Sequence, residues 1–333
     1  MKKNSVSLIV IVVIALAGLS AGLLWGPLAT PANTPPPLRI GIQPSEASTP
    51  FYVAEEQGFF TQNGLTMTMR PYAIGEQAIA AAEAGDLEVG MTAEYPLVVA
   101  AFGNRSVNAI ACIDKAQTVS VIARRDRGIA RVADLRGKRV GVTRRTAAEF
   151  YLGRLLDLNG MSILDVTVVD VPRPRNGEAV VNGSVDAVVT GTREVVPITA
   201  RLGGNATAFS AQSDQPTYVL LVCDREWAAA HPQETERLLR ALAMANEYIL
   251  ANPAEAREIA GRRANLSEET VAAVWPGHRF GLSLEQSLLT AMTDEARWAL
   301  ANSLTTATVP PDFRTYIDTT ALAGVDPDAV TIQ

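Results

Sequence analysis

Short apolar runs alternate with longer segments of helical periodicity along the first two thirds of the chain, and this pattern occurs twice. "RIGIQ" from Arg39 recurs as "RVGVT" from Arg139, and "GDLEVGMTA" from Gly85 recurs as "GSVDAVVTG" from Gly183. The two copies lie about one hundred residues apart. Each copy also has helical segments and a further strand-like run between these landmarks, which predicts the order β-α-β-α-β. The pattern therefore predicts an α/β protein of two lobes, each a doubly wound, mostly parallel sheet.

A long helical tail follows the second copy. "TYVLLVCD" predicts one more strand, and the chain is then helical almost to its end. In "ETERLLRALAMANEYILAN" the apolar residues from Leu238 to Ile249 recur at helical spacing, which indicates a helix face packed in a core.

Polar residues gather where the predicted strands end, which is where doubly wound sheets bind ligands. The loops are "QPSEASTP", "AIGEQ" and "TAEYP" in the first copy and "TRRTAAE", "PRPRNGE" and "TGTRE" in the second. We expect Thr92 and Thr190, at equivalent strand ends, to face each other across a cleft and to contact a small ligand. The alternative is that each hydroxyl only caps the turn that follows it.

The loop after the first strand of the second copy carries two arginines, Arg144 and Arg145, directly before a predicted helix. Thr146 and Glu149 have the spacing of a capping box, and Asn159-Gly160 ends the helix. The free amides and the positive dipole end of such a helix attract anions. We expect Thr146, these amides and one of the two arginines, with Arg144 favoured, to bind an anionic group; the alternative is that both arginines are solvated or paired with acids.

The N-terminal region has the pattern of an export segment. Lys2 and Lys3 precede an apolar run from Val6 to Trp25, which is long for a signal peptide and just long enough to span a bilayer. Residues 1–32 are therefore predicted to be an export signal that is either cleaved or retained as an inner-membrane anchor. Residues 33–37 form a Pro-rich spacer.

Charge and residue usage narrow the classes of function. Without Lys2 and Lys3 the chain has 27 basic and 35 acidic side chains, a net charge of −8, which argues against a nucleic-acid partner. Cys112 and Cys223 lie in apolar runs and are expected to be two buried free thiols, with a disulfide as the alternative. His231 and His278 lie far apart, so we expect structural roles for them, no metal site and no cofactor.

Several segments, in order, resemble one family. They are "LRIGIQPSEASTPFYVAEEQGFFTQNGLTMTM", "AIAAAEAGDLEVGMT", "VADLRGKRVGV", "TAAEFYLGRLLDLNG", "VVNGSVDAVV", "HPQETERLLRALAMANEYILANPAEA" and "TYIDTTAL". They are similar to the periplasmic substrate-binding proteins of ABC transporters in the nitrate/sulfonate/taurine and thiamine-precursor-binding family. The resemblance implies the two-lobed periplasmic-binding-protein fold of type II, with the helical tail on lobe one. Lobe one would comprise residues 38–122 and 218–333 and lobe two residues 123–217, with "VSVIARRD" and "TYVLLVCD" as the hinge crossings.

One segment departs from the family pattern. Sulfonate and taurine binders of this family have a Trp-x-Pro-Tyr-like run after the last strand of lobe two, where this chain has "TGTREVV". Gly191, Arg193 and Glu194 replace the aromatic and proline positions, so sulfonate specificity does not carry over. Arg193 instead adds positive charge to the second lobe.

The resemblance implies the extracytoplasmic substrate-binding component of an ABC importer, not an enzyme, that captures a small organic anion or zwitterion between its lobes. Its partners would be an ABC permease and its ATPase, and the protein would be a monomer. The alternatives are a membrane-tethered ligand sensor or an enzyme of thiamine or menaquinone biosynthesis on the same fold. The expected ligand-binding residues are Gln43, Ser45, Glu46, Gly75, Glu76, Gln77, Thr92, Glu94, Thr143, Arg144, Arg145, Thr146, Thr190, Thr192, Arg193 and Tyr218.

Overall fold

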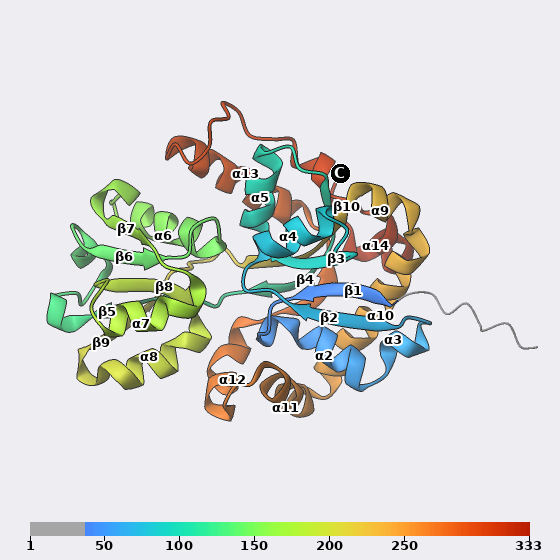
Figure 1. Cartoon of the computed structure of the whole chain (residues 1–333), viewed down its shortest axis with the longest axis horizontal. Coiled ribbons are helices and arrows are strands. Elements are labelled where there is room, and N and C mark those ends of the chain that lie inside the picture. The colour runs from blue at the N-terminus through green and yellow to red at the C-terminus, as the bar shows by residue number, and fades with distance from the viewer. Residues whose placement is uncertain (1–36) are drawn as a thin grey trace, which may run out of the picture. The chain divides into compact units, whose positions relative to one another are not determined.

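The structure is a computed structural model that describes residues 37–333. The predicted export segment, 1–32, and nearly all of the spacer lie outside the described residues. Two separate β-sheets organise the described part of the chain, each at the centre of one lobe (Figure 1). No helix between residues 37 and 333 is both long enough and apolar enough to cross a membrane.

The first sheet has six strands in the order β11-β4-β10-β3-β1-β2. Strands β1, β2 and β3 are parallel, and β10 runs antiparallel between β3 and β4. Their bounds are β1 Leu38–Ile42, β2 Met67–Pro71, β3 Val89–Ala93, β4 Val107–Ala116, β10 Thr217–Asp224 and β11 Phe280–Ser283.

The second sheet repeats this plan with five strands in the order β7-β6-β8-β5-β9. Strands β6, β7 and β8 are parallel, and β5 is antiparallel to both β8 and β9. Their bounds are β5 Val119–Arg124, β6 Arg139–Val142, β7 Thr167–Asp170, β8 Ala187–Gly191 and β9 Ala206–Ser210. Because β2-β1-β3-β10-β4 and β7-β6-β8-β5-β9 have the same order and directions, the repeat read from the sequence is a repeat of the fold.

The first residues of the two repeated runs form equivalent ion pairs. In the first lobe Glu88 accepts from the Arg39 backbone N–H at 2.6 Å, while Arg39 Nη2 donates to the Gly85 carbonyl at 2.9 Å. In the second lobe Asp186 accepts from the Arg139 backbone N–H at 2.9 Å, while Arg139 Nη2 donates to the Gly183 carbonyl at 2.8 Å. Each pair fastens the start of one central strand to the turn before its neighbour.

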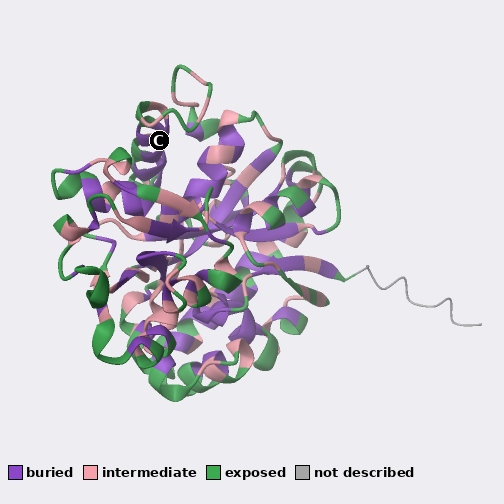
Figure 2. Cartoon of the chain, turned by 60° about the vertical axis from the view of Figure 1, so that its left-hand side comes forward, coloured by how far each residue is buried: buried purple, intermediate pink, exposed green. Residues whose placement is uncertain are grey.

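Helices cover both faces of each sheet (Figure 1), and the inner strands are largely buried (Figure 2), whereas the edge strands β2, β7, β9 and β11 are more exposed. The α-helices of the first lobe before the crossing are α2 Thr49–Glu56, α3 Phe59–Gln62, α4 Gly75–Glu83 and α5 Glu94–Phe102. Those of the second lobe are α6 Ala147–Leu158, α7 Asn176–Val181 and α8 Val195–Leu202. The tail contains α9 Arg225–Ala230, α10 Pro232–Ala251, α11 Pro253–Ala264, α12 Glu268–Val274, α13 Gln286–Ala301 and α14 Thr320–Val325.

The tail packs mainly on the first lobe, as the resemblance implied. Helix α10 contacts α2, α3 and α14, and α13 packs on α5. Leu238, Leu242 and Ala245 of α10 are fully buried, as their helical spacing predicted.

The strand pairing moves one of the expected crossings. Strand β5 pairs over its whole length in the second sheet, although Val119–Ile122 was assigned to lobe one. The chain thus leaves the first sheet at Gln117–Thr118 and returns between β9 and β10. "VSVIARRD" and "TYVLLVCD" are therefore mainly sheet strands and not the crossings themselves. The remaining lobe limits stay predictions.

Aromatic side chains join the two lobes beside the crossings. Phe150 of α6 lies 6.0 Å from Tyr95 of α5 and 5.5 Å from Trp298 of α13, measured between ring centroids. A Cβ at Gly153 would lie 2.2 Å from the Trp298 ring, so only a glycine lets this ring lie against α6. Elsewhere in the core, Cys112 and Cys223 are buried free thiols, as expected.

Candidate functional site

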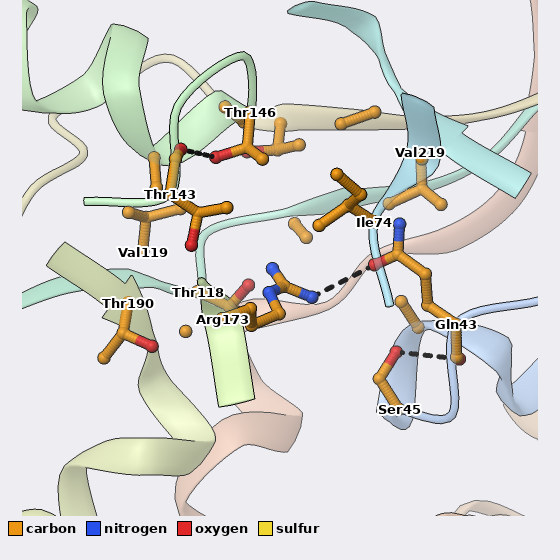
Figure 3. A pocket seen from close by; sticks show the side chains of 18 of the residues that line it. Gln43, Ser45, Ile74, Thr118, Val119, Thr143, Thr146, Arg173, Thr190 and Val219 are labelled. Atoms are coloured by element: carbon orange, nitrogen blue, oxygen red, sulfur yellow. Dashed lines mark hydrogen bonds between the residues drawn. The ribbon is translucent and has the colours of Figure 1, made fainter. Parts of the chain in front are cut away.

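A cavity of about 110 Å³ lies between the two sheets, at the carboxyl ends of their parallel strands (Figure 3). The first lobe lines it from the end of β1, the start of α4 and the end of β3, and the second lobe from equivalent positions of β6, α7 and β8. Nine of the expected ligand-binding residues line it: Gln43, Ser45, Glu46, Gly75, Thr92, Thr143, Thr146, Thr190 and Arg193. Whether they contact a ligand remains a prediction.

Thr92 and Thr190 line the same cavity from the ends of β3 and β8. The Thr92 hydroxyl donates to the Ala93 carbonyl at 3.2 Å, and the Thr190 hydroxyl lies 3.5 Å from Asn176 Nδ2. Both therefore have local partners and remain at the cavity wall. Contact with a ligand and a local role are compatible for these two side chains.

Residue 75 must be a glycine because the backbone there lies very close to Thr92. A Cβ at Gly75 would lie 2.1 Å from Thr92 Oγ1 and 2.8 Å from Thr92 Cα. The start of α4 can therefore reach the end of β3 only when residue 75 has no side chain.

Tyr218 does not line the cavity, whereas Thr217 and Val219 do. Successive side chains of a strand point to opposite faces, so the expectation was one residue out of register along β10. The backbone N–H of Tyr218 instead donates to Glu94 at 3.1 Å. Thr192 is likewise outside the lining, since its hydroxyl pairs with that of Ser120 at 3.2 Å.

Two expected residues at the start of α4 lie outside the lining. Glu76 forms an ion pair with Arg145 at 3.1 Å, which joins α4 to the loop before α6 across the two lobes. Gln77 accepts from the backbone N–H of Ala73 at 3.3 Å. The first helical turn thus contributes only Gly75 to the cavity.

Glu94 is also absent from the cavity wall, because its carboxyl group is fully buried beside that of Glu295. Burial raises the pKa of Glu94 to about 8. Burial, together with the Glu94 charge, raises the pKa of Glu295 well above its usual range. This is a carboxyl pair of the protein interior, and we do not assign it to ligand binding.

The expected arginine site before α6 is wrong in its placement. Arg144 pairs with Glu149 at 3.3 Å, Arg145 pairs with Glu76, and neither lines the cavity. The capping box is also wrong: Thr146 Oγ1 donates to the Thr143 carbonyl at 2.7 Å, and Glu149 accepts from the Arg145 N–H at 2.7 Å. Arg145 has φ +60°, a left-handed conformation that turns its amide toward Glu149.

The helix itself begins and ends where the sequence predicted. Helix α6 has Thr146 as its N-cap and Asn159 as its C-cap, and the Thr146 side chain makes no capping hydrogen bond. Thr146, Ala147 and Ala148 all line the cavity. The Glu149 amide donates to the Thr146 carbonyl at 3.0 Å, whereas within residues 37–333 no side chain caps the amides of Ala147 and Ala148. A helix start with such amides is a typical place for an anion.

Arg173, which the residue-by-residue expectations missed, takes the central cationic position. It lies in the loop "PRPRNGE", lines the cavity, and its guanidinium donates to Gln43 of the opposite lobe at 3.2 Å (Figure 3). Burial, and then the neighbouring Arg193 guanidinium, lower the pKa of Arg173 below its usual value. Arg193 itself donates to the Pro44 carbonyl at 2.8 Å and pairs with Glu194 at 3.3 Å. Two arginines of the second lobe thus reach the first lobe at this cavity.

The two lobes, with a cavity between them, have the periplasmic-binding-protein fold. The alkanesulfonate-binding protein from Xanthomonas axonopodis pv. citri bound to MOPS has this fold, with a TM-score of 0.76 and 19% identity over 86% of this chain and 100% of that chain. Residues 45–256 match the NMT1/THI5-like family, and the chain belongs to that family.

Of two relatives, one is named as a binding protein and the other for thiamine biosynthesis. A protein of Brucella abortus (strain 2308) named as a binding protein is 26% identical over 245 residues, 70% of this chain and 75% of the relative. A protein of Haemophilus influenzae named for thiamine biosynthesis is 28% identical over 228 residues, 65% of this chain and 68% of the relative.

Proposed function

We propose that this protein is the extracytoplasmic substrate-binding component of an ABC importer and that it captures a small organic anion or zwitterion between its two lobes. The observation that carries the proposal is the cavity between the lobes, into which Arg173 and the uncapped start of α6 both point positive charge. A guanidinium stays protonated and does not act as a general acid or base. An arginine at the centre of the site therefore suits ligand binding better than catalysis.

The anionic end of the ligand would lie between Arg173 and the first amides of α6. A guanidinium binds carboxylate and sulfonate oxygens through two parallel hydrogen bonds. Arg173 already makes one bond to Gln43, so ligand binding would tie the lobes together through the same side chain. The Phe150–Trp298 contact and the Arg145–Glu76 pair support a closed arrangement around such a ligand.

A ligand screen on residues 37–333 tests the proposal. Small organic anions, amino-sulfonates and aminopyrimidines are added in a thermal-unfolding assay, in which a ligand at a hundred times its Kd adds about 2.7 kcal/mol to stability. Arg173→Met should then weaken binding of the best ligand at least tenfold, because a charge-assisted hydrogen bond contributes about 1.5 to 3 kcal/mol.

Arg175→Met is the matched control, since Arg175 belongs to the same short 3-10 helix, Arg173–Arg175, but is exposed and outside the cavity lining. It should leave the affinity unchanged. Equal losses in both variants would show that general positive charge, and not a seat at Arg173, attracts the ligand. Recovery of a chemically altered ligand after incubation would favour the enzyme of the thiamine class instead.

A further inference from the structure

Three buried titratable side chains lie in a row behind the cavity wall. Asp114 of β4 is fully buried, and its Oδ2 lies 2.5 Å from His278 Nδ1. On the other side of the ring, His278 Nε2 lies 3.7 Å from Glu46 Oε1, which is ion-pair distance. The row therefore runs from the interior of the first sheet to Glu46, which lines the cavity.

The middle of this row is held in place from several sides. The His278 ring stacks on Phe280 with centroids 5.2 Å apart and an angle of 2° between the planes. Asp114 Oδ1 accepts from the backbone N–H of Arg279 at 2.9 Å, which fixes the carboxylate that holds the ring. The hydrogen bond at Nδ1 orients the ring. Nε2 then lies nearest to Glu46, at ion-pair distance but without a hydrogen bond among residues 37–333.

The charges in the row favour an imidazolium between two carboxylates. Burial lowers the pKa of His278, but the charge and hydrogen bond of Asp114 and the proximity of Glu46 outweigh it and raise the pKa to about 9. Burial likewise raises the pKa of Glu46, but His278, together with the Arg193 charge, lowers it below its usual value. Glu46 is thus held as a carboxylate at neutral pH.

One oxygen of that carboxylate lacks a partner. Glu46 is only 5% exposed, and among residues 37–333 no group donates a hydrogen bond to its Oε2. A buried, unsatisfied carboxylate oxygen is costly, and a donor supplied by a ligand would remove that cost. Glu46 and Arg173 line the same cavity from different lobes, so one small ligand can contact both charges.

Building on the function proposed above, we propose that Glu46 is the specificity-determining residue for a positively charged nitrogen on the ligand, and that Asp114 and His278 are positioning residues that hold its carboxylate toward the cavity. The site therefore selects zwitterions, or anions bearing a protonated amine or amidine, over plain organic anions. Charge complementarity to the imidazolium behind Glu46 keeps the selecting group ionised.

Matched pairs of compounds test this selection on the full chain by calorimetry at pH 7.5. The pairs are 2-aminoethanesulfonate with ethanesulfonate, and 3-aminopropanoate with propanoate. Wild type should bind the amino member at least tenfold more tightly, and Glu46→Gln, which keeps the side-chain shape, should lose that preference. Glu178→Gln removes an exposed carboxylate outside the cavity and should leave the preference unchanged.

The two proposals fail in different ways. If plain anions bind as tightly as their amino partners, or if Glu46→Gln keeps the preference, the selection by Glu46 is overturned while the binding function stands. If neither member of either pair binds to wild type, the proposed ligand class falls and the selection falls with it.

The positioning role has a readout that does not need a ligand. The chain has two histidines, so the side-chain NMR signals of His278 can be assigned by comparison with a His231→Gln variant. We expect His278 to be an imidazolium at pH 7.5 and to titrate at lower pH in Asp114→Asn. That variant should weaken binding of the amino compounds while sparing their amine-free partners. Equal loss for both members, or a neutral His278 in wild type at pH 7.5, would overturn the positioning role.

Discussion

The two lobes share one scaffold but present different charged groups to the cavity. Strand order, strand direction and the Arg39–Glu88 and Arg139–Asp186 pairs correspond between them. At the cavity, however, the first lobe contributes the Glu46 carboxylate, whereas the second lobe contributes the Arg173 guanidinium and an Arg193–Glu194 ion pair. The repeated strands and their arginine–carboxylate pairs therefore build the common scaffold, and the two lobes differ in the loops at the strand ends, where the proposed site lies.

The largest effect should come from a substitution at the start of α4, a position at which the first lobe differs from the second. Gly75→Ala places a Cβ against Thr92, including its backbone, so the start of α4 must move. We expect a loss of about 1 to 3 kcal/mol in the free energy of unfolding, as in other overpacked sites, and at least a tenfold loss of ligand affinity. Chemical denaturation and calorimetry measure the two effects.

Gly177→Ala in α7 is the second-lobe control, because its Cβ would meet Ile198 Cγ1 at 3.2 Å. That contact needs only a small adjustment, and alanine favours the helix by about 1 kcal/mol. Similar losses in both variants would mean that the close approach of α4 to β3 is not special to the first lobe.

The two equivalent ion pairs, Arg39–Glu88 and Arg139–Asp186, should contribute similarly to stability if the two scaffolds are alike. Glu88→Gln and Asp186→Asn each replace a carboxylate that accepts hydrogen bonds from the arginine at the start of a central strand by a neutral amide. We expect each to lower the free energy of unfolding by about 1 to 2 kcal/mol at pH 7, below the upper range for charged hydrogen bonds because Arg39 and Arg139 are partly exposed. Ligand affinity should not change in either variant.

The same two ion pairs should make the stability of the protein depend on pH in a direction that follows from the shifted pKa values. Burial raises the pKa of Glu88, but hydrogen bonds from Arg39 outweigh this and lower it, and the hydrogen bond from Arg139 lowers the pKa of Asp186. A carboxyl with a lowered folded-state pKa adds stability above its unfolded pKa of about 4, and this is lost as the pH falls through the folded value. The deficit of each variant should therefore shrink below about pH 4; a deficit that persists at pH 2 would assign the effect to packing.

The smallest effect should come from the strand-end threonines. Thr92→Val and Thr190→Val each remove one neutral hydroxyl from the cavity wall, so each should weaken ligand binding by about 0.5 to 1 kcal/mol. Calorimetry on both variants compares the lobes directly. Unchanged affinity with lowered stability in one variant would give that hydroxyl only its local role.

Much of the fold could be predicted because the two copies of the repeat have similar strand-like segments that end in similar residues. The loops that line the cavity follow from the same patterns, since parallel strands end at one edge of a sheet. Side-chain direction was harder. Tyr218 was expected to bind the ligand, but its neighbours Thr217 and Val219 face the cavity. Which face a residue of β10 takes depends on how β10 pairs with β4, and the sequence alone does not show that pairing.

The charged residues were harder still, because their partners come from distant segments. Glu149 was expected to cap its own helix but holds the backbone of Arg145, and Arg145 is drawn to Glu76 of the other lobe. Arg173 lay in a loop with a second arginine, Arg175, and no local signal separated the two. His278 had no nearby ligand-type residue in sequence, since Asp114 and Glu46 meet it only after the first sheet forms.

The place of β10 in the first sheet also sets an order of folding. The second sheet uses one continuous stretch, Val119 to Ser210, whereas β10 must fit between β3 and β4, which precede that stretch. If the chain emerges N-terminus first, the second lobe can close as soon as its own strands are present, while the first sheet keeps a gap until Thr217–Asp224 arrives. Pairings of such long sequence separation form slowly, so the first lobe completes last and its unpaired β3 and β4 edges are where a folding chain is most exposed to misassembly.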